Sequence, residues 1–138
     1  MRVRYSALLA LLLLAGCGGS SDGGGSGGGN PNTPTPPPSN TPPVATTTIT
    51  ITSAGVNPQR ITVAAGTRVT FMNSDSSTHE MNSDPHPTHG DCPAIDDIGF
   101  ITPGQSKQTG NLTVVRTCGY HDHNRPDVTS LQGQIIVQ

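Results

Sequence analysis

Hydrophobic positions between residue 44 and the C-terminus recur at every second residue rather than at helical spacing. Residues 46–52 alternate threonine with isoleucine, and β-branched or aromatic segments occupy residues 61–63, 68–73, 111–121 and 134–137. A period of two is typical of strands with one buried face. Turn-forming residues such as Asn57-Pro58 and Pro103-Gly104 close these segments. With no convincing amphipathic helix, the pattern predicts an all-β fold, a Greek-key β-sandwich of about seven strands.

The N-terminus has a different pattern. Arg2 and Arg4 precede an apolar run at residues 7–14 that is too short to span a bilayer as a permanent helix and is typical of an export signal. The run ends in Leu14-Ala15-Gly16-Cys17, which resembles the lipobox of bacterial lipoproteins. The resemblance implies that residues 1–16 are removed and that Cys17 is acylated as a membrane anchor. We therefore expect the protein in the cell envelope, lipid-anchored to a membrane and facing the periplasm or the exterior.

The stretch that follows the anchor is poor in apolar residues. Residues 18–29 are almost all glycine and serine, and residues 31–43 are rich in proline and threonine. Such segments bury too little apolar surface to fold. A Gly/Ser coil of this size reaches about 20 Å and a proline-rich one about 40 Å. We expect residues 17–43 to form a disordered tether for a single domain, residues 44–138.

Composition narrows the functions of that domain. The chain has no tryptophan and only two phenylalanines, so its core is small and a disulfide or a metal ion would help to stabilise it. The net charge is −2 and the basic residues are scattered, which argues against a nucleic-acid partner. No catalytic motif is present, so we expect a binding protein and not an enzyme. We also expect the protein to be a monomer.

The five histidines all lie between residues 79 and 123. His79, His86 and His89 form one group in the sequence, and His121 and His123 form another. Imidazole is the commonest protein ligand for copper and zinc. The crowding of histidines predicts a metal site that binds copper, with zinc as the other possibility. A protein that carries copper is expected to have a copper-handling or redox protein as its partner.

The order of several short segments resembles the cupredoxins, the plastocyanin and azurin family. These segments are Val69-Thr70-Phe71-Met72-Asn73 followed by His79, then Pro103-Gly104-Gln105-Ser106, Tyr120-His121 and Gly133-Gln134-Ile135-Ile136-Val137. The resemblance implies a copper-binding domain that transfers electrons, with His79 as the first ligand. It places a cysteine, a second histidine and a methionine ligand before the last strand.

Two alignments of that last ligand loop predict different chemistry. In the first, Cys118 and His121 supply the thiolate and second imidazole of a blue copper site. In the second, favoured by Tyr120 and Pro126, Asp122 takes the thiolate position, Arg125 the histidine position and Leu131 the methionine position. The site then consists of imidazoles, namely His79, His121 and His123 with His86 or His89. In this alignment Asp122 accepts a hydrogen bond from a ligand imidazole.

The cysteines bear on the same choice. With Cys17 acylated in an oxidising compartment, Cys92 and Cys118 remain, and a disulfide between them is the favoured prediction. The alternative leaves Cys118 as a copper thiolate and Cys92 unpaired. Met81 is interpreted as a core residue rather than as a ligand.

Three functions follow from these alternatives. The first is a tethered cupredoxin-like electron-transfer protein. The second keeps the metal but captures or delivers copper or zinc through an all-histidine site without a redox role. The third is a metal-free β-sandwich that binds a protein partner, which histidines scattered over the surface would favour.

Overall fold

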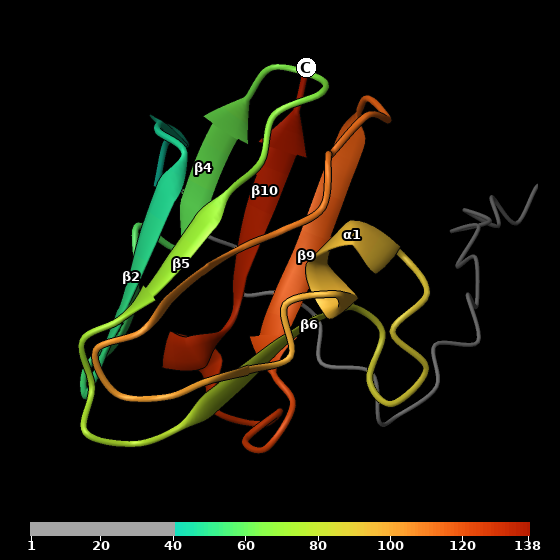
Figure 1. Ribbon diagram of the computed structural model, residues 1–138. Helices are drawn as coiled ribbons and strands as arrows, with labels where there is room; N and C mark the ends of the chain where they lie inside the picture. Colours follow the sequence, from blue (N-terminus) through green and yellow to red (C-terminus); the bar gives the residue numbers. More distant parts are fainter. Residues whose placement is uncertain (1–40) are drawn as a thin grey trace, which may run out of the picture.

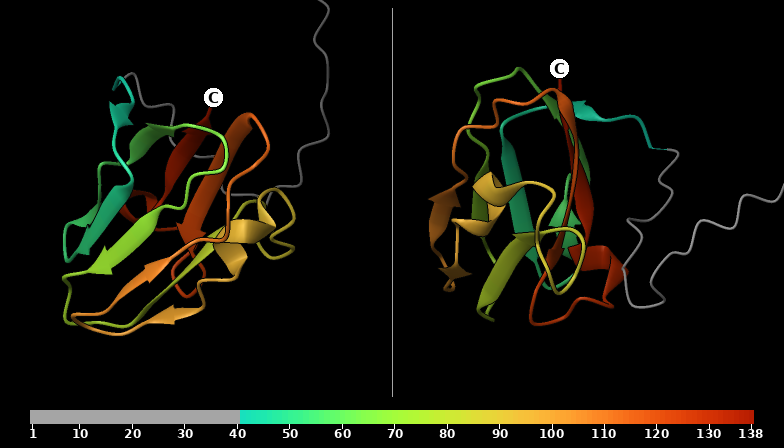
Figure 2. Two further views of the ribbon diagram at one scale, coloured as in Figure 1. Left: turned by 45° about the horizontal axis from the view of Figure 1, so that its top comes forward. Right: turned by 90° about the vertical axis from the view of Figure 1, so that its right-hand side faces the viewer.

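A computed structural model describes residues 41–138, and the predicted export signal and Cys17 lie outside this range. Two mixed sheets pack face to face, as Figure 1 and the edge view of Figure 2 show. The six-stranded sheet has the order β1-β4-β10-β9-β6-β7 and the other the order β3-β2-β5-β8. The predicted all-β sandwich is confirmed, with ten strands instead of about seven. No helix within residues 41–138 is long and apolar enough to cross a membrane.

The strands follow one another with short connections. In chain order the elements are β1 (Val44–Ala45), β2 (Thr48–Thr52), β3 (Gly55–Asn57), β4 (Arg60–Val63), β5 (Thr70–Asn73), β6 (His79–Ser83), α1 (Pro93–Asp96), β7 (Phe100–Ile101), β8 (Ser106–Gln108), β9 (Arg116–Asp122), the 3-10 helix η1 (Thr129–Leu131) and β10 (Gly133–Val137). The strand predicted over residues 111–121 begins only at Arg116. Val114 and Val115 before it are 63% and 68% exposed, so no sheet buries a face of this segment.

Alternating side chains of both sheets build the core. Ile49, Ile51 and Phe71 of the four-stranded sheet face Ile135 and Tyr120 of the other, and all five are fully buried. The rings of Phe71 and Tyr120 meet edge to face, with their centroids 5.2 Å apart, an arrangement that aromatic pairs prefer. Met81 is also fully buried in this core, as the sequence predicted.

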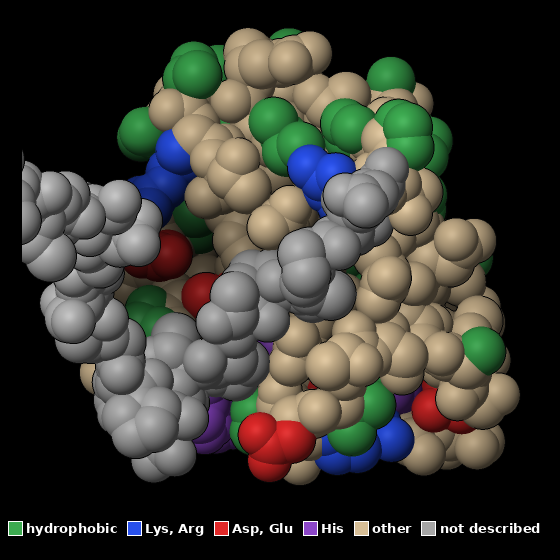
Figure 3. Space-filling model, turned by 180° about the vertical axis from the view of Figure 1, so that it is seen from behind, with side chains coloured by type: hydrophobic (Ala, Val, Ile, Leu, Met, Phe, Trp, Pro, Cys, Tyr) green, Lys and Arg blue, Asp and Glu red, His purple; other side chains and the backbone are tan. Residues whose placement is uncertain are grey.

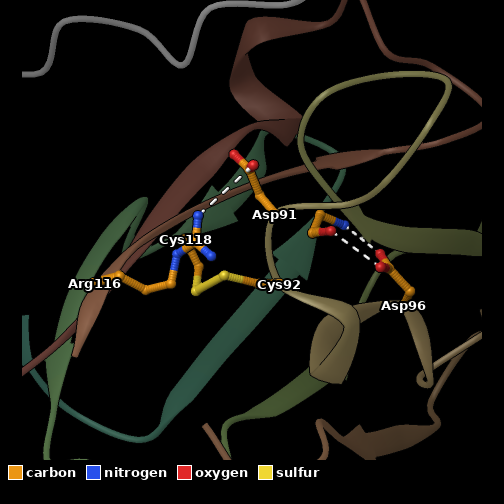
Figure 4. The surroundings of a disulfide bond; sticks show 6 residues. Asp91, Cys92, Asp96, Arg116 and Cys118 are labelled. Atoms are coloured by element: carbon orange, nitrogen blue, oxygen red, sulfur yellow. Dashed lines mark hydrogen bonds and ion pairs between the residues drawn. A yellow bond between two sulfur atoms is a disulfide. The ribbon is translucent and has the colours of Figure 1, made fainter. Parts of the chain in front are cut away.

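A disulfide between Cys92 and Cys118 joins the segment after β6 to the middle of β9 (Figure 4), which confirms the predicted pairing. The short helix α1 begins directly after Cys92. Its Asp96 accepts hydrogen bonds from the backbone N–H of Ser83 at 2.7 Å and from the Ser83 hydroxyl at 3.0 Å. The segment between β6 and α1 is therefore fixed to the large sheet at both ends.

Removal of the disulfide should destabilise the domain without changing its fold. The bond joins cysteines 26 residues apart, and closing a loop of that length stabilises a folded chain by about 3 kcal/mol. The Cys92→Ala/Cys118→Ala double variant should therefore lose about this amount in urea unfolding at equilibrium. Because a single cysteine variant leaves an unpaired thiol, the double variant is the proper comparison. Equal unfolding free energies for parent and double variant would contradict the assigned role.

Candidate metal centre

Four histidines converge at one place on the large sheet. Each of His86, His89, His121 and His123 offers one ring nitrogen, and these four nitrogens all lie within 4.8 Å of one another. We refer to these residues as the four-histidine cluster. Two come from the loop between β6 and α1, and two come from the end of β9 and the residue after it. Histidine side chains show at the lower end of the molecule in Figure 3, beside acidic and basic groups.

Strand alternation explains how β9 contributes to the cluster. Successive side chains of a strand point to opposite faces of its sheet. Cys118, Tyr120 and Asp122 face the core, so His121 between them points to the outer face, where Asn82 of β6 lies opposite it. The backbone N–H of His123 donates to the carbonyl oxygen of Glu80 at 2.7 Å. This bond continues the pairing of β6 and β9 by one residue and holds His123 beside the sheet.

The loop of residues 84–91 brings the other two histidines over His121. Its ends are joined, because the N–H of Asp91 donates to the carbonyl of Asp84 at 2.9 Å. The rings of His86 and His89 lie with their centroids 5.3 Å and 5.2 Å from that of His121. His121 is consequently fully buried although it points away from the core.

His89 adopts a backbone conformation that most residues avoid. Its φ is 49°, and within residues 41–138 no other residue except glycine has a positive φ. The left-handed region costs a residue with a Cβ about 1 kcal/mol or more. The N–H of His89 donates to the carbonyl of Pro85 at 2.8 Å, which fixes this turn. The turn places the His89 ring 4.7 Å from the ring of His123, between centroids.

Asp84 fixes the tautomer of His121. The Nδ1 of His121 lies 2.8 Å from Oδ1 of Asp84, so Nδ1–H donates to the carboxylate and the lone pair remains on Nε2. That Nε2 is buried without a hydrogen-bond partner, and so is Nδ1 of His86. Buried polar atoms without partners are uncommon and destabilising. A carboxylate behind an imidazole whose other nitrogen has no partner is the arrangement found around metal-bound histidines.

The electrostatics favour the neutral form of the two loop histidines, His86 and His89. Burial lowers the pKa of His86, and positive charge on His121 or His123 would lower it further. The pKa of His89 is lowered in the same way, first by burial and then by the same neighbours. A metal ion binds the neutral ring, so the lowered pKa values of these two side chains favour the protonation state that a metal needs.

His79 lies outside the four-histidine cluster, although the sequence placed it first among the ligands. It begins β6 on the core-facing side and is fully buried. Its Nδ1 lies 3.0 Å from Asp122 and its Nε2 lies 3.1 Å from Asp75. Asp122 therefore accepts from His79 and not from a ring of the cluster. The carboxylate behind the cluster is Asp84, which sequence reasoning missed; its only signal is its place just before Pro85-His86 at the start of the loop.

Comparisons with known proteins agree on the fold. No family model and no curated protein matches the sequence. Among solved structures, a mutant of amicyanin in its oxidised state is 20% identical, with a TM-score of 0.52 over 73% of this chain and 95% of that one. Plastocyanin from the fern Dryopteris crassirhizoma is 16% identical, with a TM-score of 0.52 over 66% of this chain and 99% of its own. A purple cupredoxin from Nitrosopumilus maritimus is 16% identical, with a TM-score of 0.50 over 67% and 100%.

These neighbours share the two-sheet architecture of residues 44–138 and almost their whole length is matched. Their low identity to this chain makes the likeness one of fold. The described part of the chain is therefore a cupredoxin-like domain.

Proposed function

We propose that this protein binds Cu(II) through the four-histidine cluster and captures or delivers copper in the cell envelope. The observation that carries the proposal is the buried Nε2 of His121, which has no hydrogen-bond partner and faces three further imidazoles. The Asp84 carboxylate behind this ring supports it as a ligand. When bound, the ion would supply a Lewis-acidic centre that the four rings hold.

The donor set favours copper over zinc. Three or four imidazole nitrogens suit tetragonal Cu(II), and divalent copper binds nitrogen sites more tightly than zinc does. The fold is consistent with this choice, since the solved structures with this fold include a mutant amicyanin in its Cu(I) form. Histidines scattered over the surface would favour the metal-free alternative, whereas four of the five lie together.

The cupredoxin resemblance implies electron transfer, but the same donor set favours copper capture over fast electron transfer. Blue copper centres need a cysteine thiolate, and both cysteines of residues 41–138 are joined in the disulfide. The Met81 thioether is buried in the core. Nitrogen ligands alone stabilise Cu(II) relative to Cu(I), because the softer Cu(I) ion prefers sulfur.

The location of the protein is part of the proposal and depends on residues outside the described range. The apolar run ending at Cys17 supports export and lipid anchoring. The Gly/Ser-rich and Pro-rich residues 18–43 support a tether that holds the domain away from its membrane. A copper-binding domain held in this way can meet copper ions and copper-handling proteins in the envelope.

Copper titration of the soluble domain, residues 41–138, tests the proposal. We expect one Cu(II) per chain and a pale colour, because the ligands are imidazoles and not a thiolate. Electron paramagnetic resonance should show nitrogen couplings of a tetragonal site. The His89→Gln/His123→Gln variant should lose the ion on desalting, whereas His79→Gln should retain it. An intense blue colour, or retention of copper by the double variant, would exclude the four-histidine site.

Asp84 should control copper affinity without being a ligand. Loss of a carboxylate behind a metal-bound histidine lowers metal affinity about 10- to 100-fold. We expect this loss in the Asp84→Ala variant, measured by competition with a chelator of known affinity. Asp84→Asn is the matched control, because its amide oxygen can still accept from Nδ1 of His121, and its loss should be smaller. Unchanged affinity in Asp84→Ala would show that the bond to His121 has no role in binding.

The metal-free domain should become less stable as the pH is lowered. The pKa values of His86 and His89 lie below the ordinary value of 6.5. At a pH near or below 6.5, the unfolded chain therefore binds more protons than the folded one, and acidification favours unfolding. Urea unfolding at neutral and mildly acidic pH should show this trend. The His86→Gln/His89→Gln variant should show a weaker dependence, and an equal dependence in both proteins would contradict the assignment.

A further inference from the structure

A second polar cluster lies on the opposite face of β9, where its end meets the start of β6. His79, Asp122 and Arg125 converge there, and we refer to them as the arginine cluster. Nδ1 of His79 lies 3.0 Å from Oδ2 of Asp122. Nε of Arg125 donates to that same oxygen at 3.2 Å, and Nη2 of Arg125 lies 2.9 Å from Nδ1 of His79. Three side chains thus meet around one point at the end of the sandwich.

The guanidinium lies over the face of the His79 ring. Its Nη2 is 2.9 Å from Nδ1 and only 3.5 Å from Nε2. A donor in the ring plane on the lone pair of Nδ1 would be much farther from the other nitrogen. Stacking leaves both ring nitrogens directed at carboxylates, with Nδ1 3.0 Å from Asp122 and Nε2 3.1 Å from Asp75. Arg125 therefore acts on His79 as a stacked cation.

Burial makes a cation necessary at this point. Asp122 is fully buried and the Asp75 side chain is 8% exposed, so the His79 ring lies between two carboxylates that have little contact with water. An unpaired buried carboxylate is strongly destabilising. Arg125, with 39% of its side chain exposed, brings a positive charge to Asp122 from the solvent side. Its charge also helps to lower the pKa of Asp75, after the larger effects of the Ser76 backbone N–H and of His79.

The arginine cluster occupies the positions at which the cupredoxin resemblance expects copper ligands. In the alignment favoured by Tyr120 and Pro126, Asp122 takes the place of the thiolate and Arg125 that of the second histidine. Leu131, in the methionine position, is buried with an aliphatic side chain. A carboxylate, a guanidinium and a leucine do not fit the blue copper donor set. A guanidinium has no lone pair with which to bind a metal.

We propose that the Arg125 guanidinium stands in the place of the metal ion, so that it closes this end of the sandwich to copper and confines copper to the other face of β9. A fixed protein cation supplies the positive charge that His79 and Asp122 would otherwise find in a bound ion. Arg125 is then the residue that determines which of two histidine-containing sites can hold metal. The closure of this end concerns the arginine cluster alone, whereas the confinement of copper to the other face of β9 rests on the proposed function.

The test uses a domain whose four-histidine cluster has been disabled by His86→Gln, His89→Gln and His123→Gln. With Arg125 present, this background should retain no Cu(II) after desalting. Copper that stays bound and is lost on a further His79→Gln change would overturn the proposal. The desalting measurement itself needs no change within the arginine cluster, and His79→Gln is made only if copper stays bound.

The second arm adds Asp122→Cys and Arg125→His to the same background. His79 and the two new side chains then provide two imidazoles and a thiolate, and copper should give an intense blue colour. The matched control adds Asp122→Cys alone, and it should stay colourless because the guanidinium remains. Circular dichroism and titration of one free thiol verify both proteins. A folded double variant without thiolate–copper absorption, or a blue control, would overturn the proposal.

Discussion

The attachment of one loop to β9 is the constraint on which both the thin core and the four-histidine cluster depend. The Cys92–Cys118 bond joins the end of that loop to the middle of the strand. The N–H of Asp84 donates to the carbonyl of Gly119 at 3.1 Å, which fixes the start of the loop to the same strand. Between these two points the chain has little freedom. Its histidines must therefore lie over the outer face of β9, and His121 is buried beneath them.

The end of β9 shows how one strand can serve two polar clusters without mixing them. His121 points outward to the four-histidine cluster, while Asp122 points inward to His79 and Arg125. The alternation of a strand separates adjacent residues by the thickness of the sheet. The two faces also differ in charge. In the outer cluster the pKa values of His86 and His89 are lowered, whereas the inner one pairs a buried carboxylate with a guanidinium.

Local pattern predicted the strands that have a continuous buried face. Ile49 and Ile51 of β2 and Ile135 and Val137 of β10 alternate with partly exposed residues, and both strands lie close to their predicted ranges. β6 contains one apolar residue, Met81, and β8 has none, so periodicity gave no signal for either strand. Their pairing with β9 and β5 supplies the stabilisation that their own sequences lack.

The site was predictable to the extent that it depends on alternation within a strand. The alternation of β9 places Cys118 on the core-facing side, and the bond to Cys92 was predicted from the expected oxidising compartment. The bond between Asp84 and His121 joins residues 37 positions apart. No local pattern encodes such a contact, because it depends on where the loop crosses the sheet. For the same reason the sequence could not separate His79 from the other histidines.

The division of the four-histidine cluster between loop and strand has a mechanical consequence. His86 and His89 come from the loop, and His121 and His123 come from the end of β9, so a shared ion would cross-link the two segments that the disulfide already joins. The two cross-links would act in parallel. Reduction of the disulfide alone would then leave the loop in place as long as the ion remains bound. The loop would detach from the strand only after both links have been broken.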